Sequence, residues 1–240
     1  MSYTKNAECY SRLVDVCTGL GGHYNPGHQP LQLKAMRALL AEAQSSLQDV
    51  LQKKEAYHRI LNERSSTFDG LTILAGRVIG TLAAVQVPSA TLEDARYYYR
   101  LLAGKRATSR PPVSSDEKDD QSPETRKFGR LTFADRAVNF ESLVRMVQGL
   151  PAYKSNEPEL QVPALMETAA NLHTLNRKVY EAKVALSTAR LQRERVFYRK
   201  NTGVVEVAMA SKRYVRVVFG TRSGEANSLK DCRFTKQKVR

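Results

Sequence analysis

The chain has 240 residues, a net charge of +14 and a sequence pI near 9.8. Its length fits one large domain or two small ones, and its 42% of apolar residues can bury a sizeable core. The lack of tryptophan and the 8% of aromatic residues favour packed helices over a β-sandwich. The positive balance indicates an anionic partner (nucleic acid, anionic lipid or an acidic protein), with a charged surface that has no dedicated ligand as the alternative.

The first hundred residues predict four helices in succession. Apolar residues at helical spacing predict a short amphipathic helix over residues 6–20. A segment free of proline and glycine predicts a long helix over residues 31–67, a rod of roughly 55 Å. Since a helix of that length needs a partner along it, we expect a bundle or a coiled-coil-like hairpin. Two more helices are expected over residues 71–86 and 91–102, separated by Pro88.

Two stretches of the chain resemble each other about 129 residues apart. Residues 10–33 match residues 140–162, and the same register continues through the long helix that follows. Such self-similarity indicates an internal duplication. The matched pairs include Tyr10 and Phe140, Leu13 and Leu143, Val14 and Val144, Tyr24 and Tyr153, Leu31 and Leu160, Val50 and Val179, Arg64 and Arg193, and Phe68 and Phe197.

The duplication predicts an all-α fold with a defined architecture. We expect an elongated antiparallel helical bundle of two tandem copies, each a short helix, a long helix and a return helix, with pseudo-two-fold symmetry. The helices expected in the second copy cover residues 134–149, 159–199 and 204–219. The expected domains are a first helical repeat (1–104), a polar flexible linker (105–133), a second helical repeat (134–220) and a basic C-terminal tail (221–240).

Positive charge is concentrated in the second copy. Residues 1–104 hold 11 lysines and arginines against 9 acidic residues, whereas residues 177–240 hold 17 against 5. A cationic surface of this kind binds phosphate backbones without sequence preference. We therefore predict a non-enzymatic helical scaffold or binding protein whose second half engages a polyanion, in first place nucleic acid. The predicted contact residues are Arg190, Arg195, Arg199, Lys200, Lys212, Arg213 and Arg216.

Three aromatic residues among these cations allow two interpretations. Tyr198, Tyr214 and Phe219 would either stack on bases or belong to the core, and the helical spacing favours the core for Tyr214. The sequence has no zinc-finger, helix–turn–helix or RNA-recognition signature that would name a target sequence. A structural or assembly module that binds an acidic protein, or a second copy of itself, is the second hypothesis.

Residues 70–86 carry the third hypothesis, a membrane-active helical bundle. Gly76 and Gly80 are spaced as in closely packed helix pairs, within an apolar run of about 16 residues. The run is short for a bilayer span and contains Arg77. A central helix packed closely in a soluble bundle is therefore the favoured interpretation, and a membrane partner is not expected.

Arg64 and Arg193 are matched between the copies, and both lie on or beside the apolar stripe of a long helix. A charge so placed needs a partner or a path to solvent. One interpretation is a pair of buried guanidiniums bonded to carboxylates such as Asp69 or Asp135. The other, which we favour, is that both side chains reach solvent near a helix end.

Residue types suited to catalysis or metal binding are scattered along the chain. No histidine pairs with a cysteine or carboxylate in a ligand pattern; Glu55 and His58 lie at i, i+3, but a di-metal site needs such pairs on facing helices. The glycines at 19, 21 and 22 lack the preceding strand and following helix of a phosphate loop. We expect no enzymatic activity, no metal and no cofactor.

The number of cysteines indicates the cellular compartment in which the protein is expected. Cys9, Cys17 and Cys232 are an odd number and do not describe a disulfide framework. The first residues also lack the apolar segment of a secretion signal. A reducing, cytoplasmic environment is therefore expected.

Overall fold

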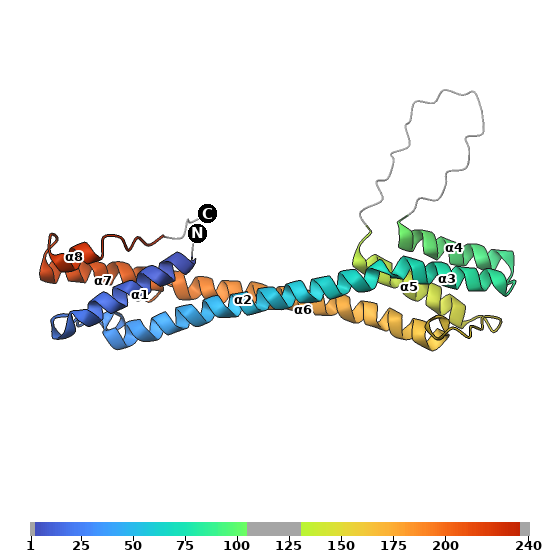
Figure 1. Cartoon of the computed structure of the whole chain (residues 1–240), viewed down its shortest axis with the longest axis horizontal. Coiled ribbons are helices and arrows are strands. Elements are labelled where there is room, and N and C mark those ends of the chain that lie inside the picture. Colours follow the sequence, from blue (N-terminus) through green and yellow to red (C-terminus); the bar gives the residue numbers. More distant parts are fainter. Residues whose placement is uncertain (1–2, 105–130, 236–240) are drawn as a thin grey trace, which may run out of the picture. The chain divides into compact units, whose positions relative to one another are not determined.

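The computed structural model describes residues 3–104 and 131–235, and these form α-helices and short 3-10 turns with no β-strand among them (Figure 1). The predicted all-α class is confirmed. The helices are α1 (Tyr3–Gly19), α2 (Leu33–Asp69), α3 (Leu71–Ala84), α4 (Ser89–Ala103), α5 (Phe133–Gln148), α6 (Val162–Tyr198), α7 (Val204–Phe219) and α8 (Gly224–Ser228), and the 3-10 turns are η1 (Gly21–His23), η2 (Gln29–Leu31) and η3 (Pro158–Leu160). Most of the predicted linker, residues 105–130, and the end of the predicted tail, residues 236–240, lie outside the described residues.

The chain divides into two compact units. Unit 1 consists of residues 1–58 and 182–240, and unit 2 consists of residues 59–181. Each unit therefore takes residues from both sides of the predicted linker. The long helices α2 and α6 contribute a part to each unit.

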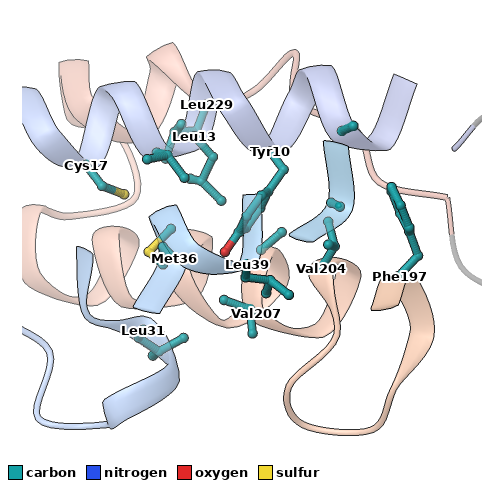
Figure 2. Close-up of a cluster of buried hydrophobic side chains, with 14 of the residues drawn as sticks. Tyr10, Leu13, Cys17, Leu31, Met36, Leu39, Phe197, Val204, Val207 and Leu229 are labelled. Carbon is teal, nitrogen blue, oxygen red and sulfur yellow. The ribbon is translucent and has the colours of Figure 1, made fainter. Parts of the chain in front are cut away.

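The core of unit 1 joins the start of the chain to its end. Tyr10 and Leu13 of α1 are fully buried against α2 and α7, as Figure 2 shows for Tyr10, which points toward Leu39. Burying the Leu13 side chain contributes about 1.5–3 kcal/mol. The other buried members include Cys17, Leu31, Met36, Ala43, Phe197, Val204, Val207, Val215 and Leu229.

The loop between α1 and α2 is fixed by a tyrosine. The Tyr24 hydroxyl donates to the carbonyl oxygen of Leu31 at 2.9 Å, and both residues are buried. A second hydrogen bond joins the same hydroxyl to the sulfur of Met36 at 3.4 Å. These contacts hold the loop against the start of α2, and the Tyr24 ring meets Tyr214 of α7.

Unit 2 has a core of its own. The end of α2 and the buried face of α3 meet α4, α5 and the start of α6. A capping box starts α5: Thr132 accepts from the backbone N–H of Asp135, and the Asp135 carboxylate accepts from the backbone N–H of Thr132. The buried residues include Phe68, Leu71, Ala75, Val78, Leu82, Ala95, Leu102, Phe140, Leu143, Val147, Tyr153, Leu165 and Leu172.

Candidate functional site

The two units differ in net charge. The described residues of unit 1 hold 18 lysines and arginines against 9 acidic residues, a balance of +9. Those of unit 2 hold 10 against 10, a balance of zero. An anion is therefore attracted to unit 1 more strongly than to unit 2.

Cations of unit 2 pair with carboxylates of the same unit. Glu141 accepts from Arg145 at 2.6 Å and contacts His173 at 2.9 Å, and these partners hold its pKa below the ordinary value. Arg77 likewise pairs with Glu159. Local pairing of this kind leaves little charge for an external anion.

Helix α7 presents three of the predicted contact residues. One face of this helix is buried in the core of unit 1, through Val204, Ala208, Ser211 and Val215 among others. Because the helix repeats every 3.6 residues, this burial turns Lys212, Arg213 and Arg216 away from the core. Lys212 is half-buried, while Arg213 and Arg216 are exposed.

The segment after α8 returns to α1 and α7. Its Leu229 and Cys232 are buried. The side-chain amide of Asn6 donates to the carbonyl oxygen of Thr235 at 3.2 Å and accepts from the Thr235 N–H at 3.0 Å. The Lys212 ammonium donates to the carbonyl oxygen of Cys232 at 2.7 Å. These contacts fix the segment, and with it two further cations, Lys230 and Arg233.

The five cations line one pocket of about 470 Å³, which we call the basic pocket: Lys212, Arg213, Arg216, Lys230 and Arg233. No carboxylate lines it, and no carboxylate of the described residues forms an ion pair with these five side chains. Burial lowers the pKa of Lys212 below its ordinary value; the thiols of Cys232 and Cys9 act in the opposite direction, and the cations of Arg216 and Arg233 lower the pKa further. Cations that repel one another in this way are stabilised by an anion placed between them.

The other predicted cations lie elsewhere on unit 1. Arg190, Arg195, Arg199 and Lys200 are exposed at the end of α6 or directly after it. Arg195 and Arg199 line a different hollow, together with two carboxylates, and the Arg199 Nε donates to the hydroxyl of Thr202 at 2.6 Å. The structure therefore brings three of the seven predicted residues into the basic pocket and leaves four outside it.

The aromatic residues that lie among these cations in the sequence pack against the core. Tyr214 meets Tyr24 edge to face with ring centroids 5.3 Å apart, and Tyr198 meets Tyr3 at 5.8 Å. Phe219 is partly buried against the same core. The core interpretation holds for these three side chains, while Phe234, which the sequence did not single out, is partly buried against the same core and also lines the basic pocket.

Arg64 and Arg193 are placed against ring faces and not against carboxylates. The Arg64 guanidinium carbon lies 4.0 Å from the centroid of Phe133, and that of Arg193 lies 3.8 Å from the centroid of Tyr3. Asp135, one of the carboxylates considered as a partner, is engaged in the capping box of α5. The Nε atoms of both arginines are buried without a hydrogen-bond partner among the described residues.

The two glycines of α3 do not make a close contact between helices. A methyl group added at Gly76 would meet the Tyr99 ring at an ordinary 3.8 Å, and one added at Gly80 would meet nothing within 4 Å. The packed face of α3 is formed by larger residues instead, among them Leu71 and Val78. In the part of the chain that the structure covers, no helix has both the length and the apolar character needed to cross a membrane.

Lys230 and Arg233 are the site residues that the sequence did not assign to the contact surface. They belong to the basic run at the end of the chain, but nothing local indicates that this run folds back onto α7. Within residues 3–104 and 131–235, no group of three or more histidine, cysteine or acidic side chains is arranged to hold a metal ion. Comparisons of the chain with protein-family models, with curated proteins and with solved structures find no match.

Proposed function

We propose that this protein is a non-enzymatic helical scaffold that binds nucleic acid through the cations of unit 1. The observation that carries the proposal is the basic pocket, where five cations converge without a carboxylate. The balance of +9 in unit 1 against zero in unit 2 supports a single binding region over a generally charged surface. The exposed cations at the end of α6 add to the attraction.

Binding would rest on phosphate groups. Lysine and arginine side chains displace the counterions that surround a nucleic-acid strand, and this release favours association at low salt. Such contacts carry no sequence information. We therefore propose binding without sequence specificity.

A matched pair of variants tests the proposal. The first replaces three exposed cations of unit 1, Arg195→Gln, Arg213→Gln and Arg216→Gln. The control makes the same change of charge in unit 2, Arg59→Gln, Lys154→Gln and Lys178→Gln, at exposed residues for which no ion pair is found within the described structure.

Fluorescence anisotropy with a labelled single strand measures the affinities. Loss of three cations of unit 1 weakens binding by at least about tenfold near 0.1 M salt, whereas the control variant binds like the wild type. Equal effects of both triple variants would show that only net charge matters. Absence of binding at low salt would exclude nucleic acid as the partner, and an acidic protein would then be the next partner to test.

We also propose that the scaffold arose by duplication, because equivalent residues of the two copies make equivalent contacts. The Tyr153 hydroxyl donates to the carbonyl oxygen of Leu160 at 2.8 Å, as Tyr24 donates to Leu31 at 2.9 Å. Arg64 and Arg193 both lie over an aromatic ring at the start of a short helix. The symmetry relation between the copies remains a prediction.

The helices that follow the two long helices give further support to the duplication. In α3 the residues Leu71, Ala75, Val78 and Leu82 are buried, at successive spacings of four, three and four. In α7 the residues Val204, Ala208, Ser211 and Val215 are buried with the same spacings. Helix α7 also buries Val205 and Val207, so the shared feature is one buried face in each of the two helices, as two copies of a unit would have.

A further inference from the structure

We infer that the basic pocket binds the terminal phosphate of a nucleic-acid strand, a phosphomonoester, in preference to the phosphodiesters along the strand. The inference rests on the proposed function and names the part of the ligand that this site takes. It is carried by the convergence of Lys212, Arg213, Arg216, Lys230 and Arg233 on one pocket of about 470 Å³.

The arrangement of the cations is the first argument. A surface that follows a strand needs cations spaced along it, one near each phosphate. Here three cations from a little more than one turn of α7 face two from the segment after α8, so five positive charges surround one space. A phosphodiester brings a single negative charge to such a space, whereas a terminal phosphate brings up to two near neutral pH and has three acceptor oxygens.

The rigidity of the pocket is the second argument. Lys212 is held by its hydrogen bond to the carbonyl oxygen of Cys232, and the segment that carries Arg233 is held by Asn6 through both hydrogen bonds to Thr235. Asn6 is fully buried while Thr235 is exposed, so its two hydrogen bonds are partly shielded from water. Lys212 therefore loses little freedom when an anion enters, and the backbone that carries Arg233 is already placed beside it.

The apolar part of the lining is the third argument. Met209 and Phe234 border the pocket beside the cations. A free inorganic phosphate has no apolar part to place there. The sugar and base of a terminal nucleotide do, and a phenyl ring next to a phosphate site is suited to contact a base.

Three versions of one short single strand test the inference by anisotropy: a strand with a 5′-phosphate, a strand with a 3′-phosphate and a strand with hydroxyl groups at both ends. Wild-type protein is expected to bind at least one of the phosphorylated strands about fivefold or more tightly than the hydroxyl strand. Comparison of the affinities for the two phosphorylated strands shows whether the 5′ end or the 3′ end of the strand enters the pocket.

Two triple variants of equal charge locate the effect. Arg213→Gln, Arg216→Gln and Arg233→Gln remove exposed cations of the pocket, and this variant is expected to bind all three strands with equal affinity. Arg190→Gln, Arg195→Gln and Lys200→Gln remove exposed cations outside it, and this variant is expected to weaken binding to every strand while it keeps the preference.

The outcomes separate this inference from the proposed function. Equal affinity of the wild type for all three strands would overturn the inference and leave binding by unit 1 intact. A preference that survives in the pocket variant would overturn it as well. Absence of binding to any strand at low salt would instead overturn the proposed function.

Discussion

The guanidinium carbon of Arg193 lies 3.8 Å from the centroid of the Tyr3 ring, which joins the end of α6 to the start of α1 within unit 1. The Tyr3 ring in turn meets Phe197 edge to face, with ring centroids 5.3 Å apart. Unit 2 has the equivalent arrangement, in which Arg64 lies over Phe133 and Phe133 meets Phe68 at 4.9 Å. An aromatic face therefore stabilises a cation that the helix places beside an apolar stripe.

A double-mutant cycle measures this contact. The cycle combines Arg193→Met, which keeps an unbranched side chain, with Tyr3→Leu, and a coupling free energy of unfolding of about 1 kcal/mol is expected from denaturant titrations. The control cycle pairs Tyr3→Leu with Arg190→Met, because Arg190 is exposed on the same helix. Coupling in the control as large as in the first cycle would contradict a direct contact.

Two glycine substitutions are expected to act in opposite directions. Gly80 is exposed inside α3 with open space where a methyl group would stand, so Gly80→Ala raises the free energy of unfolding by about 0.5–1 kcal/mol through helix propensity. Gly203 precedes α7, and a methyl group there would lie 2.6 Å from the backbone nitrogen of Arg199. Gly203→Ala therefore lowers the free energy of unfolding by roughly 1–3 kcal/mol. Thermal unfolding shows whether Gly80→Ala stabilises the protein and Gly203→Ala destabilises it. A stabilising Gly203→Ala would contradict the close approach of Gly203 to Arg199.

Stability at high pH should depend on Cys17. Burial raises the pKa of this thiol to about 11. In the unfolded chain a cysteine titrates near 8.5, so the folded state holds a proton that the unfolded state releases. The stabilising contribution is complete below about pH 8.5 and is lost as the pH rises toward about 11.

The variant Cys17→Ala isolates this contribution. Between about pH 8 and about pH 10, the free energy of unfolding of the wild type should fall more steeply than that of the variant. Equal slopes of the two proteins would show that the thiol does not titrate differently in the folded state.

Both units need segments from the two sides of residues 105–130. In unit 1, Tyr10 and Leu39 share a core with Val204 and Val207 (Figure 2). Co-expressed fragments 1–104 and 131–240 should therefore copurify through a tag on either one, with the helical circular dichroism of the whole chain. Each fragment alone should lose most of that signal. Independent folding of fragment 1–104 as a monomer would contradict the shared cores.

The helices were predictable from the sequence, and their partners were not. Periodic apolar residues bounded by glycine and proline predict the ranges of α2 and α7 to within about two residues, because such signals are local. The meeting of Tyr10 with Val207 depends on which helix faces fit across nearly the whole chain, and no local pattern encodes that fit.

The candidate site divides in the same way. Lys212, Arg213 and Arg216 were predictable because they lie close together on one helix. Arg233 lies beside these three residues because its segment folds back along the chain. The Asn6 amide holds that segment by binding the backbone of Thr235, at the far end of the described chain. An asparagine in an N-terminal helix carries no sign of that role.

The salt dependence of binding tests the central claim most directly. Log affinity of the wild type for a single strand should fall linearly with log salt, with a slope of about −0.7 for each phosphate that the cations of unit 1 neutralise. The variant Arg195→Gln, Arg213→Gln and Arg216→Gln should show a shallower slope. A slope near zero in the wild type, or an unchanged slope in the variant, would contradict phosphate binding by the cations of unit 1.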